Sequence, residues 1–475
     1  MEPPAHEPLD AVDAAWLRMD RPTNLMMICG MMMLDGPVDL AALKEVIRTR
    51  MLCFHRFRQR VAGRAGTPRW ELDPQFDLDW HVRRIALPAS ADALQQVTSD
   101  LVSTALDPSK PMWQFHLVDG AAGSAVVIRI HHCYGDGFAM LHLVDAITDL
   151  DPARPQPPGA DLAPAPPPRG AWERVAGPLG ESAGDALRAA LAVVGAGSAM
   201  LAAPLGALDA ARSGAGLLVQ AGVIAAMAPD APTRLKGKLG VMKRVAWAAP
   251  LPLAEVKAVA GVLGCSVNDV LVAGIAGALR GYLQEQGDAV DGQQVRALVP
   301  VNLRPPGPLT ELGNHFGMVF LSLPIGIDDP LERVFAVRRR MDALKQSQQA
   351  QVALAVLAGM GVAPEFLKER ILAALAANAS LVVTNVRGPQ EPHYLAGRRI
   401  TRQMFWVPQS GGIGLGVSIL SYAGEVSCGV VADVHRVPDP ADLAARFAAQ
   451  FEALLLRTLM TPWPGEAGPM QCPAQ

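Results

Sequence analysis

The sequence predicts an α/β protein of two domains, and three observations lead to this prediction. Segments rich in β-branched and other apolar residues, typical of buried strands, alternate with segments whose apolar residues recur every three or four positions, as in amphipathic helices. Half of the 475 residues are hydrophobic and 18% are charged, which supplies a large core and excludes an intrinsically disordered chain. Residues 151–170 contain eight prolines, and this density predicts an extended linker between the domains.

The block before the linker, residues 1–150, is predicted to form the N-terminal domain. Its expected elements are strands at 24–34, 113–118 and 125–131, and helices at 39–51 and 138–150. In the first helix Leu40, Leu43 and Val46 share one face. The strand at 125–131 is enriched in valine and isoleucine, which strands favour.

Residues 236–475 are predicted to form a C-terminal domain of the same style. Its expected elements are strands at 240–248, 295–302, 381–385, 414–420 and 425–433, and helices at 254–263, 267–283, 330–345 and 442–459. Leu443, Phe447, Phe451 and Leu454 lie on one face of the last helix, which predicts that this face is buried.

The segment 151–235 consists of the Pro-rich linker followed by an apolar segment that is predicted to be helical. Residues 189–208 carry no charge and are long enough to span a bilayer. Alanine and glycine dominate this stretch and Pro204 interrupts it, so its transfer energy into lipid is small. We expect a helix that packs on the domains or lies on a lipid surface rather than a transmembrane span.

Charge and motif content exclude several functions. Lys and Arg number 42 against 45 Asp and Glu, so no overall field favours nucleic acid. The six cysteines form no C-x-x-C pair and no secretory signal precedes the first domain, which predicts a cytoplasmic protein. The motifs of serine hydrolases, zinc peptidases, P-loop ATPases and Rossmann dehydrogenases are missing, and neither a metal nor a cofactor is expected.

Residues 131–137 read HHCYGDG and directly follow a predicted strand. A histidine at a strand end can point its ring into a cleft, and neutral imidazole can take a proton from a hydroxyl near neutral pH. Asp136 could orient the turn by pairing with an arginine, and Gly137 leaves room for backbone or substrate. The alternative is that His131 and His132 are structural neighbours on opposite faces of the strand.

The HHxxxDG string, with Pro111-Met112-Trp113 shortly before it, resembles the bacterial wax ester synthase/acyl-CoA:diacylglycerol acyltransferase family. The blocks LDAVDAAWLRMD, FDLDWHV, SVNDV, VPVNLRP, GNHFG and TNVRGP resemble that family in the same order and cover nearly the whole chain. The chain departs from the family where it reads NLMM at 24–27 in place of a Pro-Met-His run, Met112 in place of Leu, and Arg387 in place of Pro.

The resemblance implies two chloramphenicol-acetyltransferase-like domains with the active site in a channel between them. It also implies that His132 is the general base for attack of an alcohol on an acyl-CoA thioester, giving triacylglycerol or wax esters. In this scheme His131 and Asp136 support the turn, and Arg304 is our candidate partner for Asp136. No acyl-enzyme is needed, which agrees with the missing nucleophile motif.

Other motif residues are assigned to the channel or to structural support. They are Pro111, Trp113, Asn268, Asp269 and Arg304. Ser266 and Asp269 fit a capping pattern before the helix at 267–283, so we favour a structural cap over direct catalytic contact for the Asn268-Asp269 pair. Trp113 is interpreted as a core residue because large aromatic side chains dominate protein cores.

The partners implied by the resemblance are acyl-CoA as a substrate, diacylglycerol or a fatty alcohol as the acceptor, and the surface of the inner membrane or of lipid droplets as a peripheral contact. A homodimer is left open. Two alternatives remain from the sequence: a condensation-type acyltransferase that uses another thioester donor, and a lipid-binding relative without catalytic activity.

Overall fold

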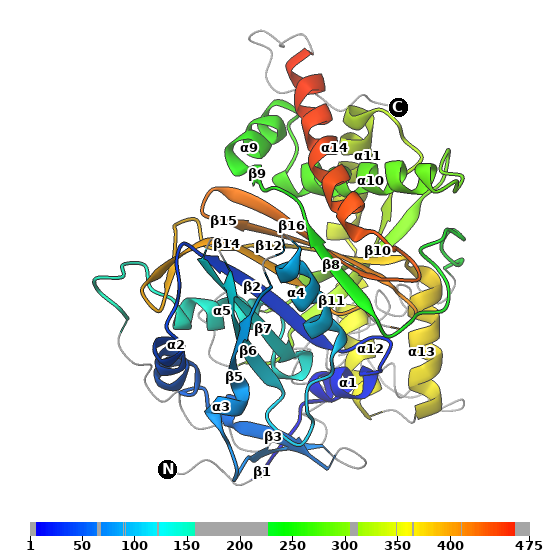
Figure 1. Cartoon of the computed structure of the whole chain (residues 1–475). Helices are drawn as coiled ribbons and strands as arrows, with labels where there is room; N and C mark the ends of the chain where they lie inside the picture. The colour runs from blue at the N-terminus through cyan, green and yellow to red at the C-terminus, as the bar shows by residue number, and fades with distance from the viewer. Residues whose placement is uncertain are drawn as a thin grey trace, which may run out of the picture.

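The computed structural model describes residues 6–156, 227–304 and 312–460, apart from short gaps at 64–67, 89, 91, 121–122, 348, 363–364 and 410. Most of the predicted Pro-rich linker and the whole apolar stretch 189–208 lie outside the described residues. The two larger sheets of the described chain lie one above the other in Figure 1.

The N-terminal half is built on a six-stranded sheet. Its order is β13 (Tyr394–Leu395), β14 (Arg398–Trp406), β2 (Met27–Leu34), β7 (Gly123–His131), β6 (Trp113–Gly120) and β5 (Val82–Ala86). A small sheet of β1 (His6–Pro8), β4 (Arg69–Leu72) and β3 (Gln59–Ala62) accompanies it. The helices of this half are α1 (Ala11–Met19), α2 (Leu40–Val46), α3 (Leu78–His81), α4 (Ala93–Ser103) and α5 (Gly137–Ile147).

The C-terminal half is built on a seven-stranded sheet. Its order is β11 (Phe316–Leu323), β10 (Val295–Asn302), β12 (Leu381–Arg387), β15 (Leu415–Tyr422), β16 (Glu425–Asp433) and β8 (Lys243–Trp247), with β9 (Leu251–Pro252) paired to β16. Its helices are α9 (Leu253–Val262), α10 (Val267–Glu285), α11 (Pro330–Lys345), α12 (Gln349–Val362), α13 (Glu365–Asn378) and α14 (Pro440–Met460). The two-domain α/β fold that the sequence predicts is therefore present.

One strand crosses between the halves. β14 belongs to the C-terminal part of the sequence but pairs antiparallel with β2, from Ile400 opposite Leu34 to Trp406 opposite Cys29. In Figure 1 this orange strand lies beside the blue β2. This strand was not predicted from the sequence, because arginines at 398, 399 and 402 interrupt it and leave only three consecutive apolar residues, 404–406. The crossing makes the N-terminal sheet depend on the C-terminal chain.

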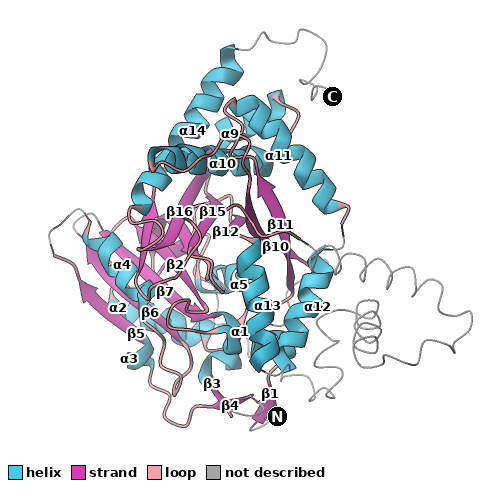
Figure 2. Cartoon of the chain, turned by 90° about the vertical axis from the view of Figure 1, so that its right-hand side faces the viewer, coloured by secondary structure: helices cyan, strands magenta, loops and turns pink. Residues whose placement is uncertain are grey.

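Buried side chains fill the space between the halves in two separate regions. Met404 and Trp406 of β14 join Met31 of β2 in a cluster that also contains Val245 and Val431 of the C-terminal sheet. On another side, α1 packs against α12, and Figure 2 shows α12 and α13 beside α1. The two halves therefore share their core rather than touching through a polar interface.

The predicted cap of α10 is confirmed. The Ser266 hydroxyl accepts a hydrogen bond from the Asp269 N–H (3.1 Å), and the Asp269 carboxylate accepts one from the Ser266 N–H (2.9 Å). This reciprocal arrangement satisfies two backbone donors that the first turn of a helix leaves unpaired. It fixes the start of a helix whose buried face forms the centre of the C-terminal core.

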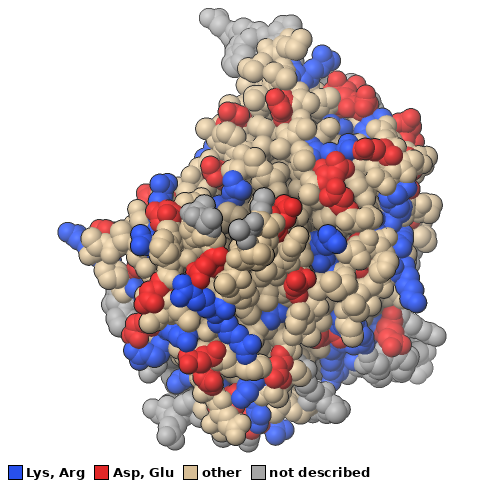
Figure 3. All heavy atoms as spheres, in the orientation of Figure 1, with Lys and Arg blue, Asp and Glu red and all other residues tan. Residues whose placement is uncertain are grey.

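Within the described ranges, no single helix is both long and apolar enough to cross a membrane; α9 and α10 together reach that length and composition, but as a pair bent by 100°. Charged residues of both signs are interspersed over the face shown in Figure 3. This distribution agrees with the near-neutral balance of the sequence.

Replacing the capping serine is expected to destabilise the protein modestly. Ser266→Ala removes the acceptor for the Asp269 N–H and should lower the free energy of unfolding by about 1 kcal/mol. The measurement is the midpoint of urea unfolding. Ser421→Ala is the control, since that hydroxyl makes no hydrogen bond to the described residues; an equal loss in both variants would contradict the capping assignment.

Candidate active site

The HHxxxDG motif forms a tight junction between a strand and a helix. β7 ends at His131, a single 3₁₀ turn spans His132–Tyr134, and α5 begins at Gly137. The Nδ1 atom of His131 accepts a hydrogen bond from the Cys133 N–H (3.2 Å), and its Nε2 lies 3.9 Å from the Asp20 carboxylate. His131 therefore folds back on the turn, whereas His132 is free to present its ring elsewhere.

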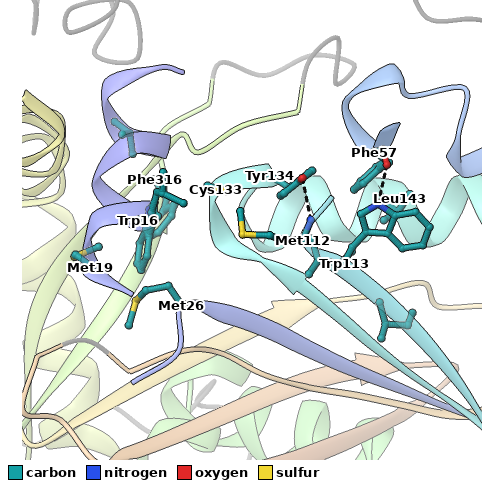
Figure 4. Packing of buried hydrophobic residues seen from close by; sticks show 14 of the residues in the cluster. Trp16, Met19, Met26, Phe57, Met112, Trp113, Cys133, Tyr134, Leu143 and Phe316 are labelled. Atoms are coloured by element: carbon teal, nitrogen blue, oxygen red, sulfur yellow. Dashed lines mark hydrogen bonds between the residues drawn. The ribbon is translucent and has the colours of Figure 1, made fainter. Parts of the chain in front are cut away.

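The ring of His132 is held by two aromatic side chains from different halves of the molecule. It stacks on Trp16 of α1 at 4.0 Å between ring centroids and 14° between planes, and Phe316 of β11 lies 5.6 Å away. Figure 4 shows Trp16 and Phe316 side by side at this position. Flat stacking leaves the imidazole little freedom to rotate. The two aromatic rings thus fix the plane in which the His132 nitrogens lie.

The two nitrogens of His132 have different surroundings. Nδ1 is buried and makes no hydrogen bond to the described residues. Nε2 is not among the fully buried nitrogens, although the residue as a whole is only 5% exposed. The ring borders a cavity of about 110 Å³, so it is not sealed inside packed protein.

The cavity draws its walls from both halves of the chain. It is lined by Trp16, Ile28, His132, Asp136, Gly137, Phe138, Pro300, Asn302, Phe316, Met318, Val382, Thr384, Asn385, Val386, Phe405, Val407 and Pro408. A substrate bound there would lie between the two domains, as the resemblance implied. We call it the catalytic cavity below.

Burial decides the protonation state of His132. Removal from water disfavours the charged imidazolium and lowers the pKa of His132 to about 4, although the nearby Asp136 carboxylate acts in the opposite direction. The imidazole is therefore neutral at neutral pH. Neutral imidazole has a free lone pair and can accept a proton.

Asp136 is a structural anchor that ties the motif to the C-terminal half. Its carboxylate pairs with Arg304 (2.9 Å) and accepts hydrogen bonds from the N–H groups of Phe138, Ala139 and His315 at 2.9–3.1 Å. The prediction that Asp136 pairs with an arginine is confirmed, and the partner is Arg304. Arg304 also donates to the Gly313 carbonyl (2.5 Å), so one guanidinium holds both the motif and the loop beside it.

A second polar link was missed by the sequence analysis. The Nδ2 group of Asn314 donates to the His132 carbonyl and to the Asp13 carboxylate, each at 2.8 Å. Burial and the neighbouring Asp10 raise the pKa of Asp13 to about 7. Asn314 and Phe316 lie in the GNHFG block, and Asp13 and Trp16 in the first family block. These blocks supported the family resemblance, but their positions in sequence gave no sign that they meet at His132.

Two apolar cavities adjoin the catalytic cavity. One, of about 80 Å³, lies under α5 and shares Ile28, Gly137, Val386 and Phe405 with it. The other, of about 240 Å³, lies between β10, β11, α12 and α13 and shares Met318 with it. A Cβ atom added at Gly137 would meet nothing within 4 Å, so this glycine keeps the junction with the first cavity open.

Comparison with known proteins identifies the family. The model of the wax ester synthase/diacylglycerol acyltransferase catalytic domain matches residues 9–271, and that of the family's C-terminal domain matches residues 312–455. The chain belongs to this family. The expected family and the enzyme class, acyltransferase, are thus confirmed.

Relatives match this family member over most of their length. The Mycobacterium tuberculosis protein named probable diacylglycerol O-acyltransferase tgs1 is 29% identical, over 92% of this chain and 93% of its own. The protein named tgs2 from the same organism is 30% identical, over 84% of this chain and 86% of its own.

Solved structures with low sequence identity share the fold. A wax ester synthase/diacylglycerol acyltransferase from Marinobacter aquaeolei superposes with a TM-score of 0.68 at 22% identity, covering 96% of this chain and all of that one. The starter condensation domain of rhizomide synthetase superposes with a TM-score of 0.57 at 12% identity, covering 97% and 96%. The predicted acyltransferase fold of two related domains is confirmed by these likenesses.

The remaining motif residues of this acyltransferase lie around the site rather than in it. Trp113 is fully buried and its indole N–H donates to the Phe57 carbonyl (2.8 Å; Figure 4), so it is a core residue. Its backbone N–H donates to the Pro111 carbonyl (2.9 Å). Asp269 caps α10. Asn268 accepts a hydrogen bond from Asn385 (2.9 Å), and Asn385 lines the catalytic cavity. Asn268 therefore helps to position a residue of the cavity wall without lining the cavity itself.

Breaking the Asp136–Arg304 pair is expected to destabilise the junction of the two halves. Arg304→Met leaves a buried carboxylate without its counter-ion and should lower the free energy of unfolding by about 3 kcal/mol. Arg304→Lys keeps the charge but loses the second hydrogen bond, so its loss should be smaller. Urea unfolding measures both, and equal stability of wild type and Arg304→Met would refute the anchoring role.

Proposed function

We propose that the protein transfers a long-chain acyl group from acyl-CoA to the hydroxyl of diacylglycerol or of a long-chain alcohol, with His132 as the general base. The observation that carries the proposal is the neutral His132 ring, which borders a cavity that adjoins two apolar cavities. An apolar cavity on each side fits two substrates that each carry a hydrocarbon chain.

The proposed reaction needs only one proton carrier. His132 Nε2 takes the hydroxyl proton while the alcohol oxygen attacks the thioester carbonyl carbon. The tetrahedral intermediate then collapses, the carbon–sulfur bond breaks, and the proton on His132 passes to the departing thiolate of coenzyme A. An ester and free coenzyme A result, and His132 returns to its neutral form.

The substrates favour a peripheral position at the inner membrane or on lipid droplets, facing the cytoplasm. Apolar side chains at the end of α14 support this part of the proposal, since Leu459 is 66% exposed and Met460 is 78% exposed. Flotation of the protein with phospholipid vesicles tests the contact. Light scattering in solution tests the homodimer that the sequence left open.

Removing the imidazole is expected to abolish most turnover. His132→Ala should lower the rate of coenzyme A release from palmitoyl-CoA and hexadecanol by about 10²–10⁴-fold, the usual contribution of general-base assistance. Circular dichroism checks that the variant is folded. The exposed His435 lines none of the described cavities, so His435→Ala should keep full activity. Near wild-type release by folded His132→Ala would remove His132 from the mechanism.

The pH profile should reflect the buried position of the base. Only the neutral ring accepts a proton, and burial lowers the pKa of His132 to about 4, so kcat/KM should stay flat at neutral pH and fall only as the pH drops through about 4. Burial raises the pKa of Asp13 to about 7. An additional change in kcat/KM near pH 7 that is absent from the Asp13→Asn variant would therefore be assigned to Asp13. A midpoint near 6.5 that persists in Asp13→Asn would contradict the burial argument.

Acceptor and donor profiling separates the proposal from its alternatives. Purified protein is given palmitoyl-CoA with hexadecanol or with diacylglycerol, and the esters are resolved by thin-layer chromatography. Formation of either ester from acyl-CoA supports the proposal. Turnover only with an acyl-carrier protein favours a condensation-type enzyme, and lipid binding without turnover favours a non-catalytic relative.

A further inference from the structure

The cavity under α5 is almost entirely apolar. It lies between α5 and the face of the N-terminal sheet that carries Ile28, Met32 and Ile128. Gly30 has no side chain to fill this face, and so contributes space in the middle of the cavity. Its surroundings suit a hydrocarbon chain that continues from the catalytic cavity.

Gln403 is the exception in this lining. β14 places Gln403 opposite Met32 and Phe405 opposite Gly30, so both side chains lie on the face that borders the cavity. Gln403 is 4% exposed, and its Nε2 is buried without a hydrogen-bond partner among the described residues. Its Oε1 makes no hydrogen bond to those residues either, and the two ends of the amide can exchange by a flip.

An amide without partners is unfavourable in such a place. A primary amide offers two donors and an acceptor, and burying them unpaired costs free energy that an apolar residue of similar size would avoid. Methionine residues already form much of this region, including Met31, Met32 and Met140. The amide is therefore expected to find its partner in what occupies the cavity.

The position of the amide defines which part of a ligand it meets. Phe405 borders both the catalytic cavity and the cavity under α5, and Gln403 lies two strand residues, about 7 Å, beyond it. A group bonded to Gln403 is thus well separated from the reacting carbonyl or hydroxyl. It belongs to the distal part of the chain.

We propose that Gln403 is a specificity residue that binds an oxygen-bearing group, a hydroxyl above all, on the distal part of the lipid chain held under α5. The inference deepens the proposed function and rests on it. It names hydroxylated long chains as a substrate class, whether the hydroxyl is carried by the acyl-CoA or by the acceptor alcohol.

The test compares plain and hydroxylated chains in both positions. One arm uses palmitoyl-CoA against 16-hydroxypalmitoyl-CoA and 12-hydroxystearoyl-CoA with hexadecanol as the acceptor. The other arm uses palmitoyl-CoA with hexadecanol against 1,16-hexadecanediol. Wild type is compared with Gln403→Met, which keeps the length of the side chain and removes both polar ends. Met33→Leu is the matched control, because that side chain packs against the cluster on the other face of the same sheet and lines none of the cavities described above.

The expected result is a change in the ratio of kcat/KM for hydroxylated to plain chains. In one arm, Gln403→Met should lower this ratio at least about tenfold, and kcat/KM for the plain chain should stay the same or rise. Met33→Leu should leave the ratio unchanged. The arm that responds identifies which substrate occupies the cavity. An unchanged ratio in both arms would overturn the proposal and leave Gln403 as the ligand of a structural water.

A binding measurement keeps this inference separate from the catalytic proposal. Thermal stabilisation of His132→Ala by 16-hydroxypalmitic acid and by palmitic acid is measured with and without Gln403→Met. Preference for the hydroxy acid that is lost in the double variant supports the chain-binding role even if His132 is not the base. Equal stabilisation by both acids in both variants refutes the role, whatever the turnover assays show.

Discussion

The buried carboxylate of Asp136 is the interaction on which the site depends. It receives an arginine and three backbone N–H groups, two from the start of its own helix and one from His315 in the C-terminal half. A carboxylate that is almost fully buried is tolerated only when its charge is balanced and its oxygens are hydrogen-bonded. Here the balancing charge comes from Arg304, 168 residues away in sequence. The arrangement makes the HHxxxDG turn complete only when both halves are folded together.

The aromatic side chains that pack against His132 also come from both halves of the molecule. Trp16 comes from the first helix and Phe316 from an edge strand of the C-terminal sheet, and His132 lies against both. Packing the ring in this way fixes its direction but also removes water from it. The lowered pKa of His132 follows from that desolvation, which the nearby Asp136 offsets only in part. An imidazole that remains neutral throughout the physiological range is the chemical consequence of the same packing that positions it.

Space in the structure is created by small residues and by the crossing strand. Gly137 leaves the catalytic cavity open toward the cavity under α5, and Gly30 leaves room farther along the sheet. β14 closes the far wall and brings Phe405 and Gln403 to it. Because β14 comes from the C-terminal sequence, the pocket of one domain is finished by the chain of the other. The polarity of that pocket is consequently set by a residue of β14, outside the HHxxxDG motif.

The sequence by itself determined the features that are local. The alternation of strand and helix patterns, the Ser266–Asp269 cap and the turn at His132 each depend on residues a few positions apart, whose hydrogen bonds and periodicity can be read directly. The sequence indicated that Asp136 could pair with an arginine, but no feature of the sequence identified Arg304 among the arginines of the chain. Tertiary structure alone decided that β14 joins the N-terminal sheet, that Trp16, Asn314 and Phe316 meet at His132, and that Gln403 faces an apolar cavity. These contacts join residues more than a hundred positions apart. Their pairing is chosen by the packing of whole sheets, which leaves no periodic signal in the segments themselves.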